Sequence, residues 1–217
     1  MKTYIMRVIR LMFGLLLYAI GIVLTINADI GYAPWDVFHV GFASTFGMSI
    51  GMASIITGLA IGVIAVILGE KIGIGTVLNM VLIGVFVDWI MLAGFVPIAT
   101  NFFFGVPMMI TGIVTISLAT YFYISAAFGS GPRDSLMVAV TRKTGLPVGF
   151  CRGSIEILAV IVGWQLGGKV GVGTILFAFL IGFFVQTTFK ALHFNATEIS
   201  HETLDQTFLT ITGKPAK

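Results

Sequence analysis

The sequence GYAPWDVFHVGFASTFG occupies residues 31–47, and GSGPRDSLMVAVTRKTG occupies residues 129–145. Both stretches begin and end on glycine and carry Pro-X-Asp after the opening turn, and they lie 98 positions apart. The same register continues without an insertion from residues 31–87 onto residues 129–185. The chain therefore contains one structural unit twice.

The composition predicts an integral membrane protein with an all-α fold. Hydrophobic residues make up 58% of the chain, charged residues 10%, and the mean hydropathy is +1.07, whereas soluble domains carry about 25% charged residues. Crossing a bilayer core of about 30 Å takes about 20 helical residues. Apolar stretches of this length lie at roughly 8–28, 50–69, 74–97, 105–127, 148–166 and 171–189. We expect six spans, three in each copy, with the lipid bilayer around them.

The charge distribution predicts the orientation in the membrane. Positive charges beside spans favour the cytoplasmic side, and Lys2, Arg7 and Arg10 surround the start of the first span. The N-terminus is therefore expected inside, and six spans return the C-terminus to the same side. Because each copy holds three spans, the second enters from the opposite face. Such an inverted-topology repeat is common in secondary transporters, which bind substrate near the midplane.

These spans divide the chain into three predicted parts. Residues 1–98 form the first repeat with spans 1–3, and residues 99–190 form the second with spans 4–6. Residues 191–217 form a cytoplasmic tail, which we expect to be a mobile or surface-lying amphipathic end.

Each copy also contains a segment that is too short and too polar to cross, at residues 34–46 and 132–144. Proline suits the first position of a helix, and an aspartate two residues later favours its positive end. We therefore predict helices that begin at the prolines and close at Gly47 and Gly145. Two arrangements remain open. The helices are either re-entrant, with their N-termini toward the interior, or interfacial, lying flat on opposite faces.

Trp35, Asp36, Arg133 and Asp134 are the central candidates for substrate binding. The aspartates occupy equivalent positions beside glycine-rich turns, so they are either ligands at a pseudo-two-fold site or caps of their own helices. Arg133 replaces Trp35 of the first copy. Such asymmetry between matched copies would determine selectivity, although an arginine here could instead determine topology.

Arg152 and Glu156 lie four residues apart in the fifth span and can pair on one helical face. Their counterparts are Ser54 and Gly58, so this pair belongs to the second copy alone. A charge within a span costs about 2.5–3.5 kcal/mol on insertion scales. We expect the pair to line the cytoplasmic entrance of the site, with a purely structural ion pair as the alternative.

Asp88 lies deep in the third span, where the other copy has the neutral Gln186. It is a candidate for ion or proton coupling. It could equally lie at the outer interface, because the adjacent Trp89 belongs to a residue type that prefers the headgroup region.

Other classes of function find little support in the residues. Cys151 is the only cysteine, so no intrachain disulfide or cysteine metal cluster can form, and His39 has no second metal ligand at the required spacing. We expect no metal and no cofactor. No set of nucleophile and base is apparent, which argues against an enzyme. Most basic residues flank spans, so no nucleic-acid partner is expected, and a chain this small could form a homodimer.

Four motifs together resemble a known family: IGYAPWDVFHVG, GPRDSLMVAVTRKTGL, EKIGIGT and GGKVGVGT. They are similar to those of the bacterial YczE/YyaS/YitT-type integral membrane proteins, which have twin PWD and GPRD motifs. The resemblance extends to about residue 190. It implies a protein of the bacterial cytoplasmic membrane and carries over no catalytic residue.

The sequence thus predicts a small transporter or channel for a small polar or anionic solute. Its site is expected near the midplane, where the two Pro-X-Asp motifs approach each other. The alternative is a non-transporting membrane subunit or a regulator of a larger membrane complex.

Overall fold

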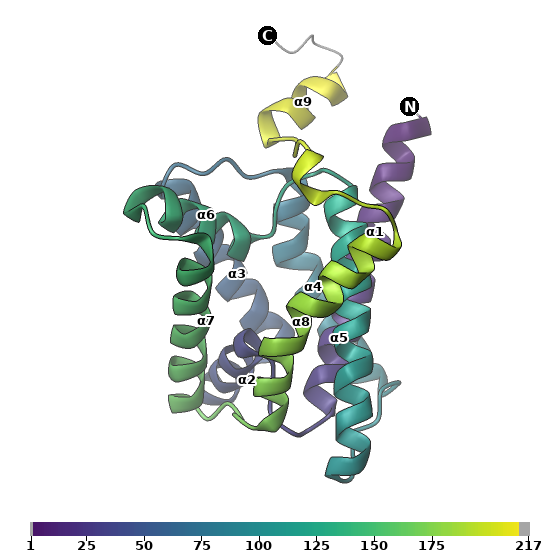
Figure 1. The fold of residues 1–217 in the computed structure, drawn as a ribbon, viewed down its shortest axis with the longest axis vertical. Coiled ribbons are helices and arrows are strands. Elements are labelled where there is room, and N and C mark those ends of the chain that lie inside the picture. The colour runs from purple at the N-terminus through teal and green to yellow at the C-terminus, as the bar shows by residue number, and fades with distance from the viewer. Residues whose placement is uncertain (1, 213–217) are drawn as a thin grey trace.

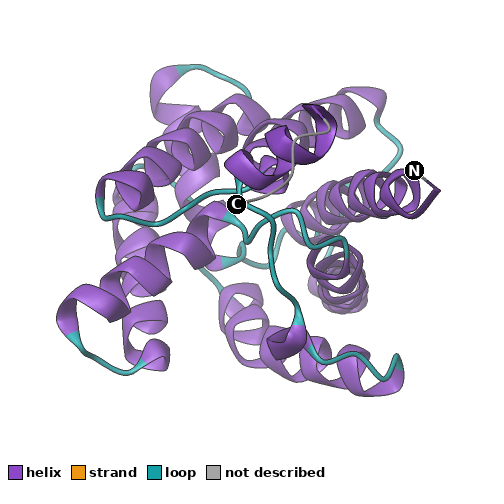
Figure 2. Ribbon diagram, turned by 90° about the horizontal axis from the view of Figure 1, so that it is seen from above, coloured by secondary structure: helices purple, strands orange, loops and turns teal. Residues whose placement is uncertain are grey.

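The computed structural model describes residues 2–212, which fold into helices joined by short loops (Figures 1 and 2). Figure 2 shows helices and loops, and no strand, among these residues. The bounds are α1 Lys2–Asn27, α2 Pro34–Phe46, α3 Ile50–Ile67, α4 Ile74–Ala93, α5 Phe102–Ser125, α6 Pro132–Thr144, α7 Val148–Gln165, α8 Val172–Ala191, the 3-10 helix η1 Ala196–Glu198 and α9 Leu204–Thr212.

Among the described residues, six helices are long and apolar enough to cross a membrane, namely α1, α3, α4, α5, α7 and α8. The expected all-α fold is confirmed, and these six candidate spans correspond to the six expected ones. The start of α1 and the end of α4 differ most from the expected bounds. The first helix begins at Lys2, because its charged first turns continue the helix beyond the apolar stretch, and α4 ends at Ala93 rather than near residue 97. Gly94 stops α4 by adopting a left-handed conformation with φ 66°.

The internal repeat extends to the helix bounds. The helices α2 and α6, α3 and α7, and α4 and α8 begin and end at positions that lie 98 apart. The two short helices begin at Pro34 and Pro132 and are followed by Gly47 and Gly145, with φ values of 65° and 71°. Only glycine adopts this left-handed region without a steric penalty. Both short helices therefore have the expected bounds.

The most extensive contact between the copies joins α1 and α5. Glycine permits this close approach, since an added Cβ on Gly21 would lie 3.1 Å from the carbonyl oxygen of Gly112. The reciprocal distance, from a Cβ on Gly112 to the carbonyl oxygen of Gly21, is 3.0 Å. In lipid, helices associate through such small-residue contacts. The two long helices thus join the copies along their length.

Two further contacts cross between the copies, because α2 packs against α7 and α6 packs against α3, whereas α4 packs on α1 and α8 on α5 within their own copies. The loops follow the same rule. Gly75 at the start of α4 donates a backbone hydrogen bond to Phe128 at 2.7 Å, and its counterpart Gly173 donates one to Ile30 at 2.8 Å. The two repeats are consequently interlocked in space.

The end of the chain returns to the helical body. The backbone N–H of Glu202 donates to Ala127 at 2.9 Å, and that of Leu204 donates to Ile72 at 3.0 Å. The Glu202 carboxylate also forms an ion pair with Arg7. Figure 1 places α9 at the same end of the molecule as the start of α1. The expected mobile or surface-lying tail is thus anchored up to α9 by these contacts, while residues 213–217 lie outside the described part.

Candidate functional site

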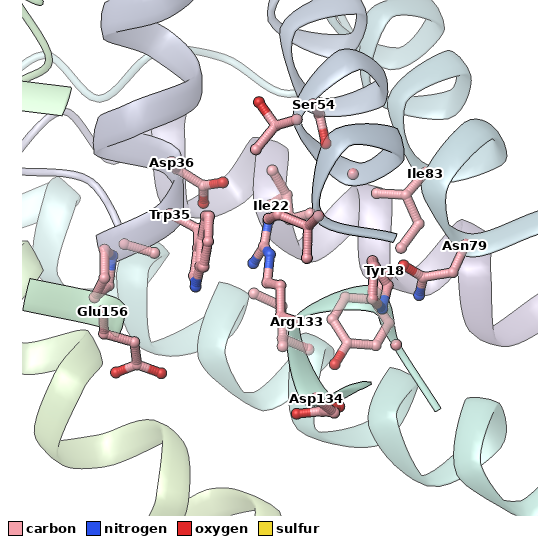
Figure 3. A pocket seen from close by; sticks show the side chains of 18 of the residues that line it. Tyr18, Ile22, Trp35, Asp36, Ser54, Asn79, Ile83, Arg133, Asp134 and Glu156 are labelled. Atoms are coloured by element: carbon pink, nitrogen blue, oxygen red, sulfur yellow. The ribbon is translucent and has the colours of Figure 1, made fainter. Parts of the chain in front are cut away.

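A cavity of about 190 Å³ lies between the two copies and is lined by residues from α1 to α8 (Figure 3). Most of its lining residues occur as pairs that lie 98 positions apart. These pairs include Tyr18 and Ile116, Ile22 and Thr120, Pro34 and Pro132, Trp35 and Arg133, Asp36 and Asp134, His39 and Met137, Ser54 and Arg152, Gly58 and Glu156, Asn79 and Phe177, and Ile83 and Ile181. The cavity therefore lies where equivalent positions of the two copies meet.

Arg133 extends from the first turn of α6 into this cavity, beside Trp35 of the other copy (Figure 3). Its Cζ lies 4.7 Å from the Trp35 ring centroid, within the range of a cation–π interaction. In the described part of the chain, Arg133 forms no ion pair with a carboxylate. A guanidinium has five N–H donors, so several donors of Arg133 remain for a solute.

Asp36 and His39 connect to Arg133 from α2. The Asp36 Oδ1 lies 3.4 Å from the His39 Nδ1, and both side chains are buried. The other ring nitrogen, Nε2, lies 3.5 Å from the Arg133 Nη2. The carboxylate orients the ring, because the partner of one nitrogen determines what the other presents. His39 is thus a polar contact between the two Pro-X-Asp helices.

Among the described residues, no backbone N–H of α2 or α6 donates a hydrogen bond to Asp36 or Asp134, so the geometry gives no support to simple capping. Asp134 is exposed and lines the cavity, and Figure 3 places it near Tyr18. Its carboxylate has no hydrogen-bond partner in the described part of the chain and is available to a solute or to water.

The charged groups of the cavity carry both signs. Arg133 and Arg152 contribute two positive charges, and Asp36, Asp134 and Glu156 contribute three negative ones. A uniformly positive field is therefore absent from the described lining. Anion binding would depend on the unpaired guanidinium of Arg133, and the carboxylates would suit the donor groups of a polar solute.

Arg152 and Glu156 form the expected pair on α7, with an Nε to Oε1 distance of 3.0 Å. Both line the cavity, and their side chains are 56% and 30% exposed. Cavity residues on α3 are shielded, since Thr57 is only 8% exposed. Arg152 and Glu156 therefore lie at the exposed edge of the cavity along α7.

Asp88 lies apart from the other candidates and does not line the cavity. It accepts a hydrogen bond from the Ser49 hydroxyl at 2.5 Å and one from the Gly51 backbone N–H at 2.7 Å. Ser49 and Gly51 form the start of α3. Asp88 therefore joins α4 to the N-terminus of α3.

Sequence reasoning missed Tyr18, Asn79 and Thr120 among the cavity residues. The Tyr18 hydroxyl lies 2.8 Å from the Thr120 Oγ1 and joins α1 to α5. A signal for these residues was present, because polar side chains inside apolar spans mark functional positions. Only the fold, however, shows that they face the same cavity as the Pro-X-Asp motifs.

Comparisons with known proteins agree with this membrane architecture. The model of a family of unknown function, DUF6198, matches residues 5–190. The chain is 38% identical over 175 residues to the uncharacterized membrane protein YczE of Bacillus subtilis, an overlap of 80% of each chain. It is 33% identical to an uncharacterized protein of Haemophilus influenzae, covering 81% of this chain and 80% of the relative. Identity to YyaS of Bacillus subtilis is 24%, with 75% and 82% covered. No solved structure matches the chain.

Proposed function

The chain belongs to the DUF6198 family and is a multi-pass membrane protein, and from this premise we propose that it is a small transporter or channel. Its cargo is a small polar or anionic solute that binds between two inverted copies near the midplane. It acts without catalysis in the bacterial cytoplasmic membrane, with both termini in the cytoplasm.

Two observations support the inverted arrangement. Figure 1 places the equivalent short helices α2 and α6 toward opposite ends of the molecule. Basic residues lie at the end where α1 begins, since Arg7 contacts the returning tail and α6 carries Arg142 and Lys143 in its last turn. Positive charge on one side favours a cytoplasmic location for that end.

The observation that carries the proposal is the unpaired guanidinium of Arg133 above Trp35, inside a cavity shared by both copies. An arginine within a membrane protein is costly unless it is paired or functional. The cation–π contact and His39 hold the group in place while leaving donors free. A carboxylate or a comparable polar oxygen would complete its hydrogen bonding, because guanidinium fits planar oxygen pairs.

The volume and the lining restrict the solute. About 190 Å³ accommodates a small molecule rather than a polymer. Apolar groups such as Ile22, Ile83 and Phe177 form part of the wall, and Asn79 and Tyr18 add polar atoms. We therefore expect a solute with one anionic or polar end and a compact remainder.

Trp35 provides a direct binding assay because it contacts Arg133. In a Trp89→Phe, Trp164→Phe background, Trp35 is the only tryptophan. Its fluorescence would be titrated in nanodiscs with acetate, lactate, benzoate and phosphate as probes and with glycerol as a neutral probe. We expect at least one probe to give a saturable change that Arg133→Gln abolishes. Arg142→Gln is the matched control, because Arg142 pairs with Glu70 outside the cavity.

The same probe would then be tested for flux in proteoliposomes. Flux that depends on Arg133 supports a transporter or channel. Binding without flux would instead identify a non-transporting subunit. The absence of any saturable Trp35 response, or an equal response in Arg133→Gln, would contradict the proposed site.

A further inference from the structure

The two copies differ in how their last two helices pack. The helices α3 and α4 meet so closely that an added Cβ on Gly51 would lie 2.0 Å from the carbonyl oxygen of Gly84. The reciprocal Cβ on Gly84 would lie 2.4 Å from the carbonyl oxygen of Gly51. The equivalent residues Gly149 and Gly182 have no described atom within 4 Å of such a Cβ. Along their fully described lengths, α7 and α8 do not pack as α3 and α4 do.

Hydrogen bonds close the first pair and have no equivalent in the second. The Asp88 carboxylate on α4 binds the Ser49 hydroxyl and the Gly51 N–H at the start of α3. The corresponding residues are Gln186 and Pro147. Proline has no hydroxyl to donate. The hydrogen bonds of Asp88 to Ser49 and Gly51, which we call the clamp, therefore belong to the first copy alone.

The open pair borders the cavity. Arg152 and Glu156 on α7, and Phe177 and Ile181 on α8, line it. On the side of the first copy, α3 and α4 are in contact beside the cavity. On the side of the second copy, α7 and α8 are separated and Arg152 is 56% exposed.

We propose that α7 and α8 form a gate whose closed state brings Gly149 and Gly182 together, as Gly51 and Gly84 are here, while α3 and α4 separate. This inference rests on the proposed transport function and assigns its two states. A glycine inside a helix costs about 1 kcal/mol relative to alanine, and Gly149 and Gly182 gain no packing contact in the observed state. Close approach in the second state accounts for them, since it requires the absence of a side chain.

A reciprocal exchange of side-chain size supports the same closure. In the first copy, a Cβ on Gly58 would lie 3.3 Å from the Cβ of Met80. Glycine, which has no side chain, on α3 therefore packs on the long methionine side chain of α4. Their counterparts are Glu156 and Ala178, which reverses the sizes. A closed α7 and α8 would thus have room for Glu156 beside Ala178. The bond from Arg152 would neutralise Glu156 as it becomes buried.

The two glycine pairs lie near opposite short helices. Gly51 is in the first turn of α3, directly after α2, and Gly149 is in the first turn of α7, directly after α6. In the orientation that we propose, α7 and α8 gate the cytoplasmic side and α3 and α4 gate the outer side. The observed structure is then open toward the cytoplasm.

Pulsed spin-label distance measurements test this gate without knowledge of the solute. One label pair would replace Met52 and Val85 on α3 and α4, and the equivalent pair would replace Phe150 and Phe183 on α7 and α8. All four side chains are exposed, so the labels would not enter the contacts. The background is Cys151→Ser, and the protein is in nanodiscs.

Removing the clamp should move both gates in opposite directions. In Asp88→Ala, we expect the α3–α4 distance to lengthen and the short-distance population of the α7–α8 pair to rise severalfold. Ser49→Ala removes one of the two hydrogen bonds and should give a smaller shift of the same sign, which guards against a variant that merely unfolds. Gly149→Leu, added to Asp88→Ala, should abolish the short α7–α8 population. The control Ser154→Leu should not, because its counterpart Ile56 faces outward.

An α7–α8 distance that stays the same in Asp88→Ala and in Ser49→Ala would overturn the gate. A short α7–α8 population that survives Gly149→Leu would overturn the assigned contact. Neither measurement depends on Arg133. The distance measurements can therefore refute the gate without refuting the proposed binding site, and the binding assay can refute the site without refuting the gate.

Discussion

The first copy carries Trp35, Gly58 and Asp88 at positions where the second carries Arg133, Glu156 and Gln186. Around these differences, the two copies retain the same helix bounds and the same left-handed glycines after α2 and α6. The shared glycines and prolines shape the backbone, whereas the positions that differ supply Arg133, Arg152 and Glu156 to the cavity and Asp88 to the start of α3. The two copies thus share their helix bounds and differ in the side chains that they contribute to the cavity.

The comparison also separates two uses of glycine. Gly75 and Gly173 are in close contact with the loops of the opposite copy in both repeats. Gly51 and Gly84 are in close contact in the first copy, and Gly149 and Gly182 are free of contacts in the second. The shared glycines therefore distinguish contacts that are present in both copies from a contact that is present in the first copy alone.

The largest expected difference between the copies is at the first glycine of α3 and α7. Gly51→Leu should destabilise the protein by about 3 kcal/mol, because overpacking a close contact costs this much and the carbonyl of Gly84 cannot yield. Gly149→Leu should stay within about 0.5 kcal/mol of the parent, as open positions do. Unfolding in detergent measures both. Equal losses at the two positions would mean that the copies pack alike.

The start of α4 and α8 should behave in the opposite way, with matched effects. Gly75→Ala places a Cβ 2.8 Å from the Cβ of Phe128, and Gly173→Ala places one 2.4 Å from the carbonyl oxygen of Gly31. Each should cost about 2 kcal/mol, within the range of overpacked sites. The same unfolding assay applies. A loss at only one of them would show that the loop exchange is specific to that copy.

The clamp should contribute to stability in the first copy only. Asp88→Ala removes the acceptor of two hydrogen bonds, and bonds to a charged group contribute about 1.5–3 kcal/mol. Gln186→Ala, at the equivalent exposed position, should change stability by less than about 0.5 kcal/mol. Denaturation midpoints of the two variants provide the comparison. A comparable loss for Gln186→Ala would remove the asymmetry.

The smallest effect concerns the tail, which covers one end of the molecule. Burial lowers the pKa of His201 from its ordinary value of 6.5, although Asp134 partly opposes the shift. A lowered pKa means that the anchored tail favours neutral histidine. Anchoring should therefore be complete above about pH 6.5 and weaken as the pH falls below that value, because protonation favours the released tail.

Proteolysis of α9 at pH 7.5 and at pH 5.5 measures this release. Cleavage should be faster at the lower pH, and His201→Gln should remove the pH dependence. The same variant at His193, which lies after α8 and outside the cavity, is the control. A pH dependence that persists in His201→Gln would assign it to another group.

Much of the fold was predictable because its signals are local. The short helices begin at Pro34 and Pro132 and end before Gly47 and Gly145, and backbone geometry alone determines these bounds. The apolar runs likewise indicated the spans. The position of α9 depended on hydrogen bonds from Glu202 and Leu204 to distant loops, which no local pattern encodes.

The candidate site was predictable in its centre and less so in its surroundings. The repeat pointed to Trp35 and Arg133 because equivalent residues of an interlocked pair tend to meet at the axis between the copies. Asp88 was grouped with them because it is a charge within a span, yet it binds the start of α3. Helical periodicity does not determine whether the Asp88 side chain faces the cavity or a neighbouring helix. The packing of α3 on α4 determines this direction.

The central claim is that two inverted copies enclose the site, and the matched residues Lys71 and Lys169 test it most directly. Both are exposed and lie in equivalent connections, between α3 and α4 and between α7 and α8. Each would be replaced by cysteine in a Cys151→Ser background and treated with a membrane-impermeant maleimide. Inverted copies predict labelling of Lys169→Cys in intact cells, and of Lys71→Cys only after permeabilisation. Labelling of both variants from the same side would contradict the account.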